Sequence, residues 1–172
     1  QLVYELGDDN ALVIQLTLIE YLSAAGELQT KPTQHSVKTL MESGIKADVL
    51  VCRTEHELTD ELREKLALFC NVKKEAVIQS IDVKSIYEVP LKIQEEGLDT
   101  VVLNRLQLDP HSTTQLEEWK QFLAVLDQPK HQLRIGLVGK YVELQDAYKS
   151  ILEALLHAGV ANEAAVEVVP IH

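Results

Sequence analysis

Short apolar runs rich in β-branched residues alternate along the chain with longer amphipathic segments. Three apolar runs predict buried strands, at 12–19, 48–53 and 76–81. Helices are expected at 32–43, near 85–96 and after a cap at Thr59, where the apolar stripe is Leu62, Leu66, Phe69 and Cys70. Strands separated by helices are typical of a parallel α/β sheet.

The pattern restarts after a polar, proline-bearing stretch at 127–132. Before it, Thr113 is expected to cap a helix whose apolar face is Leu116, Trp119, Phe122, Leu123 and Leu126. After it come a strand at 133–138, a helix at 146–158 and a strand at 165–171. The inward side chains expected on that helix are Ala147, Ile151, Ala154, Leu155 and Ala158. A new βαβ unit predicts a second domain. Without further elements this domain would be only marginally stable, because it buries little apolar surface.

Composition restricts the class of ligand. The chain has 172 residues, 46% hydrophobic and 25% charged, as in soluble globular proteins. Acidic residues outnumber basic ones by 27 to 16, and a net charge of −11 repels nucleic acid and anionic lipid. No apolar run approaches the roughly 20 residues of a membrane span, so a cytoplasmic protein is expected. A polyanionic ligand would need a local cluster of cations.

The two cysteines, Cys52 and Cys70, each lie in or beside an apolar run. Two cysteines are too few for a disulfide framework, so buried thiols in a reducing compartment are expected. The sequence has no CxxC motif and no paired histidine spacing, and no metal site is predicted in this segment.

A polar loop after Gly26 enters the first helix and is the first candidate for chemistry. Free backbone N–H groups and the helix dipole favour an anion at such a position. Lys31 adds charge, and the hydrogen-bonding side chains there are Thr30, Thr33, Gln34 and Ser36. The same residue types also form ordinary helix caps, so both interpretations stay open. The GxxxxGK[ST] pattern of a Walker A loop is absent.

Three further charged residues occupy positions of interest. Arg53 and Asp82 end two predicted strands, and ligands of open α/β sheets collect beyond such ends. Lys65 lies at the margin of the apolar stripe of its helix. Solvated charges, a capping carboxylate and a lysine extended to solvent explain the same residues without function.

A glycine turn follows the strand at 133–138. Gly139 permits a tight bend, and helix capping by Asp146 explains much of the segment from 136 to 149. No histidine pairs with a cysteine or serine in a nucleophile motif. Taken alone, these patterns predict an α/β fold suited to nucleotides and nothing more specific.

Read together, the segments resemble CTP synthases. The matching residues are 16–18, 26–37, 48–53, 65–72, 82–83, 85–87, 138–144 and 146–150, in the order of the family. The runs TKPTQHSV at 30–37 and VGKY at 138–141 are highly specific in combination. Related P-loop-like enzymes such as dethiobiotin or cobyrinate synthetases are disfavoured by the Lys31–Gln34 loop and by the second domain.

The resemblance implies a two-domain ligase. In its P-loop-like amidoligase domain, ATP phosphorylates the 4-oxygen of UTP, and ammonia displaces the phosphate to give CTP. A class I glutamine amidotransferase domain with a Cys-His-Glu triad supplies the ammonia. Residues 1–112 would be the later part of the amidoligase domain, 113–132 a helix and linker, and 133–172 the start of the glutaminase domain. The chain would then be an internal fragment, inactive alone, without P-loop, magnesium ligands or triad.

The same resemblance implies the site residues and partners. UTP, or CTP as feedback inhibitor, would bind at Gln29, Thr30, Lys31, Pro32, Thr33, Gln34 and Lys65. ATP would bind at Arg53, Asp82 and Val83, and GTP as effector near Lys140, Tyr141 and Lys149. ATP and Mg²⁺ are the implied cofactors, glutamine the nitrogen donor, and a homotetramer the implied assembly. No catalytic or metal-binding residue is expected in this segment.

One residue departs from the family pattern. Most members carry lysine where this chain has Gln29, and the lost charge is expected to weaken triphosphate binding. An alternative from another class is a nucleotide-binding or oligomerisation module derived from the same family but without catalysis. A gene that encodes only these residues, with its own start codon, would favour this alternative.

Overall fold

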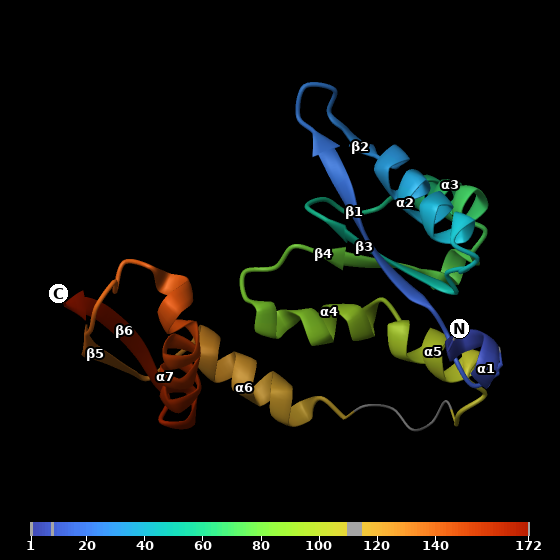
Figure 1. Cartoon of the computed structure of the whole chain (residues 1–172). Coiled ribbons are helices and arrows are strands. Elements are labelled where there is room, and N and C mark those ends of the chain that lie inside the picture. Colours follow the sequence, from blue (N-terminus) through green and yellow to red (C-terminus); the bar gives the residue numbers. More distant parts are fainter. Residues whose placement is uncertain (1, 8, 110–114, 172) are drawn as a thin grey trace. The chain divides into compact units, whose positions relative to one another are not determined.

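The computed structural model describes residues 2–7, 9–109 and 115–171. The chain divides into two compact units, Gln1–Thr114 and Gln115–His172 (Figure 1). The described helix α6 (Glu117–Asp127) therefore belongs to the second unit. Thr113, the expected cap of this helix, lies outside the described residues.

The first unit contains a four-stranded sheet in the order β2-β1-β3-β4. β1 (Ile14–Leu22), β3 (Val49–Thr54) and β4 (Val77–Ile81) run parallel, whereas β2 (Glu27–Gln29) runs antiparallel to β1. The mostly parallel α/β sheet predicted from the sequence is confirmed.

Strand β2 corrects the prediction of a polar loop after Gly26. The chain reverses at this glycine, whose φ of +69° is costly for other residues, and its N–H donates to Leu22 O at 2.8 Å. The return segment then pairs with β1, with Leu28 opposite Tyr21. A strand of three residues is too short to show a periodic pattern of apolar residues in the sequence. It becomes a strand because its backbone pairs with β1.

Helices cover both faces of this sheet (Figure 1). α2 (Lys31–Glu42) and α3 (Asp60–Cys70) lie on one face, and α4 (Val89–Glu95) and α5 (Leu98–Arg105) on the other. Short helices α1 (Leu2–Leu6), η1 (Lys74–Ala76) and η2 (Ile86–Glu88) complete the unit. α5 was not predicted, since its short sequence has only a weak apolar stripe.

Helix α3 packs on the sheet in a different rotation from the predicted one. The Thr59 hydroxyl accepts a hydrogen bond from Leu62 N at 3.3 Å, which confirms the predicted cap. Leu66 and Cys70 are buried, but Phe69 is 61% exposed. The Arg63 guanidinium donates a hydrogen bond to Val77 O, so the side of α3 that carries Arg63 faces the sheet. Phe69 therefore points away from the sheet.

Strand β1 is buried on one face only, contrary to the prediction of a fully buried strand. Thr17 and Ile19 are buried, whereas Leu16 and Leu18 on the opposite face are 69% and 52% exposed. On that opposite face, the apolar cluster formed with α5 covers Val49 and Ile78 of β3 and β4 instead.

The second unit is the expected βαβ unit. β5 (His131–Val138) pairs in parallel with β6 (Ala164–Ile171), and η3 (Gln145–Tyr148) and α7 (Lys149–Ala161) connect them. Helix α6 precedes them, and its predicted apolar face, Leu116, Trp119, Phe122, Leu123 and Leu126, is half-buried.

Two expectations for α7 were wrong. Asp146 does not cap it, because Tyr148 occupies the N-cap position. Of the inward side chains expected, Leu155 is half-buried, whereas Ala147, Ile151, Ala154 and Ala158 are exposed. Leu152, Leu156 and Val160 line the inner side instead. A Cβ at Gly159 would lie 2.5 Å from Ala164 O. Helix α7 therefore comes closest to β6 at this glycine, and this contact determines which side of the helix faces the strand.

One ion pair connects three elements of the first unit. The Arg63 guanidinium donates to both carboxylate oxygens of Glu96 at 2.8 and 3.2 Å and to Val77 O at 2.9 Å. The same carboxylate accepts from Gln79 N at 3.0 Å. Because the two side chains are only 20% and 22% exposed, removal of either leaves a half-buried charge without its partner.

We therefore expect Glu96→Ala to lower the free energy of unfolding by about 2 kcal/mol. Glu95→Ala is the matched control, because Glu95 forms an exposed ion pair with Lys92 on the helix surface, and such pairs contribute little. Equilibrium urea unfolding followed by far-ultraviolet circular dichroism measures both. Equal losses in the two variants would contradict the role of the Arg63–Glu96 pair.

The two thiols are buried, as predicted, on the side of the sheet covered by α2 and α3. Burial raises the pKa of the Cys70 thiol to about 11, with a smaller contribution from nearby Cys52. Burial also raises the pKa of Cys52, although a hydrogen bond from Thr17 and the charge of Arg63 oppose it.

Both cysteines should therefore resist alkylation in the folded protein. At about pH 8 we expect iodoacetamide to label them at least about 10-fold more slowly than in denaturant, since only the thiolate reacts. Peptide mass spectrometry of timed samples resolves the two sites. Rapid native labelling of either would show that its environment is not the buried one described.

Candidate functional site

A pocket of about 570 Å³ lies beside the β1–β2 hairpin, at the beginning of α2 and the flank of α3. Four residues expected to bind UTP line it: Gln29, Thr30, Lys31 and Lys65. The structure therefore brings together two segments that are far apart in the sequence. We take this pocket as the candidate site.

The hairpin and the start of α2 position the first three of these residues. Gln29 ends β2, and Thr30 follows as the buried N-cap residue of α2. The Thr30 side chain makes no capping bond to the helix but accepts one from Gln34 Nε2 at 3.1 Å. Lys31 begins the helix, where the positive end of the dipole also favours an anion.

Three other residues of the predicted UTP loop do not line this pocket. The buried Thr33 hydroxyl donates to Leu18 O at 3.1 Å and ties α2 to β1. Gln34 supports Thr30 through the hydrogen bond just described, and Pro32 occupies the first helical turn, where no backbone donor is required. In this structure all three hold the loop in place.

Both lysines have charges available for a ligand. Lys31 and Lys65 are exposed, and neither forms an ion pair within 4.0 Å among the described residues. The marginal position of Lys65 on the stripe of α3 lets its side chain reach the pocket, in agreement with the sequence-based position.

Sequence reasoning missed two aromatic side chains in the pocket wall. Tyr21 of β1 and His56, after β3, contact each other with ring centroids 4.0 Å apart and planes tilted by 54°. His56 lies two residues beyond the carboxyl end of β3, a position where ligands of parallel sheets collect. That signal could have identified it.

The residues expected at the ATP adenine form a second group in the first unit. Arg53 Nε lies 3.1 Å from Asp82 Oδ1, and both side chains are exposed at the carboxyl ends of β3 and β4. Asp82 N donates to Thr54 O at 2.9 Å, and half-buried Val83 follows. These three residues do not line the pocket of Lys31 and Lys65.

The residues expected near the GTP effector lie in the second unit. Lys140 Nζ is 4.9 Å from the centroid of the Tyr141 ring, and Tyr141 has an unusual φ of +61°. The Tyr148 hydroxyl donates to Lys140 O at 2.6 Å and holds this turn. Lys149 is the first residue of α7.

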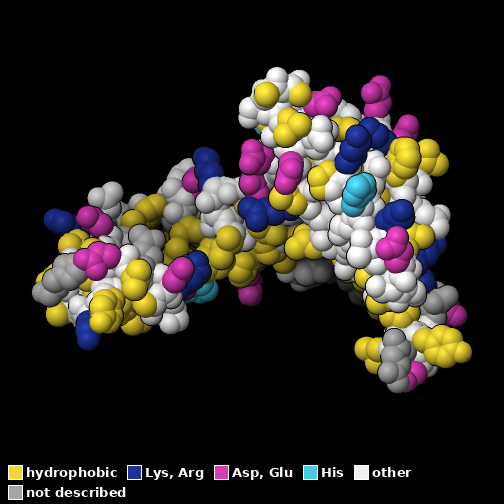
Figure 2. All heavy atoms as spheres, turned by 45° about the horizontal axis from the view of Figure 1, so that its top comes forward, with side chains coloured by type: hydrophobic (Ala, Val, Ile, Leu, Met, Phe, Trp, Pro, Cys, Tyr) yellow, Lys and Arg dark blue, Asp and Glu magenta, His cyan; other side chains and the backbone are white. Residues whose placement is uncertain are grey.

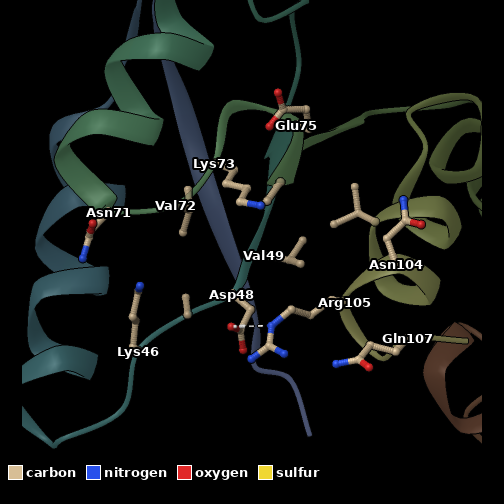
Figure 3. Close-up of a pocket in the computed structure, with 13 residues that line it drawn as sticks. Lys46, Asp48, Val49, Asn71, Val72, Lys73, Glu75, Asn104, Arg105 and Gln107 are labelled. Atoms are coloured by element: carbon tan, nitrogen blue, oxygen red, sulfur yellow. Dashed lines mark hydrogen bonds and ion pairs between the residues drawn. The ribbon is translucent and has the colours of Figure 1, made fainter. Parts of the chain in front are cut away.

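A larger cavity of about 1060 Å³ lies at the opposite, amino ends of β3 and β4 (Figure 3). Its most prominent polar contact is the ion pair between Arg105 Nε and Asp48 Oδ1 at 3.2 Å, with Lys46 and Lys73 nearby. None of the predicted site residues lines it. Because open parallel sheets bind ligands at carboxyl ends, the smaller pocket remains the candidate site.

The molecular surface seen in Figure 2 carries both signs of charge. On the face seen in Figure 2, acidic and basic side chains are interspersed and form no large patch of one sign. Among the described residues, no group of three or more histidine, cysteine or carboxylate side chains could hold a metal ion. No helix in the described part of the chain is long and apolar enough to cross a membrane.

Comparison with known proteins gives consistent matches. Residues 1–108 match the family model described as CTP synthase N-terminus. A CTP synthase of Flavobacterium johnsoniae is 68% identical over the whole chain, and those of Methanocaldococcus jannaschii and Aquifex aeolicus are 52% and 50% identical over 98% of it. The chain spans only 31–32% of the length of these relatives.

These matches are coarser than the prediction in two respects. The family model assigns residues 1–108 to the amino-terminal part of CTP synthases and does not support the expectation of an internal fragment. It also gives no support to a glutaminase assignment for 133–172. The family model matches most of the chain, and the relatives match nearly all of it. The chain therefore belongs to the CTP synthases.

Proposed function

We propose that this chain is part of a ligase that aminates UTP to CTP, and that the 570 Å³ pocket binds the triphosphate of UTP or of the inhibitor CTP. The observation that carries the proposal is that Lys31, at the beginning of α2, and Lys65, on α3, line the same pocket. Two lysines without an ion pair among the described residues, beside a helix N-terminus, match a polyphosphate better than a neutral ligand.

The net charge makes this convergence informative. A protein with a charge of −11 repels a nucleoside triphosphate at long range, so binding depends on cations concentrated at one place. Lysine ammonium groups neutralise charge, and hydroxyl, amide and backbone donors such as those at Thr30 and Gln29 orient the phosphate oxygens.

The proposed reaction uses ATP with Mg²⁺ and ammonia released from glutamine. Arg53, Asp82 and Val83 would bind the adenine end of ATP, supported by their grouping at the carboxyl ends of β3 and β4. The described residues include no carboxylate cluster that fits a metal ion, so no magnesium ligand is assigned to them. The residues described would bind and orient nucleotides.

The second unit would begin a glutaminase domain. Its support is the parallel βαβ unit of β5, α7 and β6. The turn with Lys140 and Tyr141, together with Lys149, would contribute to the site of the GTP effector, and a homotetramer would be the active assembly. A segment with these parts but no catalytic groups would be inactive on its own.

The decisive assay is CTP formation by the complete polypeptide encoded by the gene that carries this sequence. UTP, ATP and Mg²⁺ are supplied with either ammonium or glutamine, and CTP is expected with both. The alternative is a non-catalytic nucleotide-binding module, which would bind UTP or CTP but form no CTP from either nitrogen source.

Removal of either lysine is expected to weaken UTP binding. In the complete enzyme, Lys31→Ala and Lys65→Ala should each raise the KM for UTP about 10-fold and weaken CTP inhibition similarly, because charged hydrogen bonds to phosphate are lost. Lys38→Ala on the exposed side of α2 is the control and should change neither constant. Unchanged KM and inhibition in both pocket variants would rule out this triphosphate site.

Gln29→Lys tests the departure from the family pattern. Gln29 lines the pocket, and its amide lies 3.4 Å from Glu27 Oε1. An ammonium group there should tighten CTP binding about 3- to 10-fold, as measured by isothermal titration calorimetry. An unchanged dissociation constant would mean that this position does not contact phosphate.

A further inference from the structure

His56 is held in the candidate pocket by its own backbone. The hydroxyl of buried Thr54 donates to His56 O at 2.8 Å and accepts from His56 N at 3.3 Å. Two residues further on, Leu58 N donates to the side chain of Gln79 on β4. The segment around His56 is therefore fixed to β3 and β4 on both sides of the histidine.

The imidazole ring belongs to an exposed residue but has one ring contact. It contacts the ring of Tyr21 at a centroid distance of 4.0 Å, and Tyr21 is itself held opposite Leu28 in the β1–β2 pairing. Both rings line the pocket that contains Lys31 and Lys65. The ring of His56 thus lies on the pocket wall before any ligand arrives, which lowers the entropic cost of a contact.

The charges around this ring are mixed. Lys31 of α2, Lys65 of α3 and Glu27 of β2 line the same pocket, and Glu55 and Glu57 flank His56 in the chain. When the imidazole is neutral, the charged side chains that line the pocket are the two lysines and Glu27. A protonated His56 would supply a third cation.

We propose that His56 binds the phosphates of UTP or CTP together with Lys31 and Lys65, and that it makes nucleotide affinity depend on pH. The inference rests on the proposed triphosphate site. Histidine ordinarily changes its charge between about pH 5 and 8. An imidazolium attracts phosphate and donates from both ring nitrogens, whereas the neutral ring donates from one. Affinity therefore rises as pH falls, and binding takes up protons.

The test compares CTP binding by the complete polypeptide at about pH 6 and about pH 8. Isothermal titration calorimetry with CTP and Mg²⁺ is applied to the unsubstituted protein, His56→Gln and His56→Lys. The terminal phosphate of CTP also titrates in this range, but its contribution is common to all three proteins. His35→Gln is the matched control, because His35 is exposed on α2 outside the pocket.

We expect the ratio of affinities at the lower and higher pH to be about 3- to 10-fold larger in the unsubstituted protein than in His56→Gln. His56→Lys should bind more tightly than His56→Gln at the higher pH and show the same small ratio. His35→Gln should keep the ratio of the unsubstituted protein.

An unchanged ratio in His56→Gln overturns the inference, as does equal affinity of His56→Lys and His56→Gln at the higher pH. If Lys31→Ala weakens CTP binding at the same time, only the role of His56 fails and the proposed site stands. If the unsubstituted protein binds no CTP, the proposed site and this inference are both wrong. Circular dichroism spectra confirm that each variant is folded.

Discussion

The Glu96 carboxylate connects the covering helices of the first unit to the wall of its pocket. It binds Arg63 of α3 and the backbone of Gln79 in β4, and the side chain of Gln79 in turn holds Leu58 N. A continuous polar network therefore runs from the end of α4 to the segment that carries His56. Such networks are strong only when every member is satisfied, so loss of one partner should loosen the pocket wall as well as the helix packing.

The other wall of the pocket depends on the β1–β2 hairpin and α2. The turn at Gly26 places β2 against β1, and the Thr33 hydroxyl fixes α2 to Leu18 O. The residues of the TKPTQHSV run therefore fall into two structural groups. Thr30 and Lys31 line the pocket, whereas Thr33 and Gln34 form hydrogen bonds that hold the loop in place. A substitution at Thr33 would act on the site through its position, without contact with a nucleotide.

The sequence predicted those features that local physics determines. Strands β3 and β4, the cap at Thr59 and the burial of both cysteines follow from apolar runs and capping chemistry. Tertiary packing decided the remainder: pairing with β1 creates β2, the reach of Arg63 turns Phe69 outwards, and close approach at Gly159 rotates α7. For the pocket, the residue pattern singled out Lys31 and Lys65 as candidates and the family resemblance assigned them to UTP, whereas the contact of Tyr21 with His56 depends on strand register and was not predicted.

The placement of charge explains how an acidic chain could select triphosphates. Scattered carboxylates repel all anions weakly, and salt screens that repulsion beyond about 8–10 Å. In the proposed site, Lys31 and Lys65 would act at contact distance, where screening is slight and the dipole of α2 would add to them. A singly charged anion would gain less from the two lysines than a triphosphate, which can contact both at once. Selectivity for triphosphates would then depend on how many cations the ligand contacts at once. For the same reason, a change in the charge of His56 in the pocket wall would change the affinity for the nucleotide.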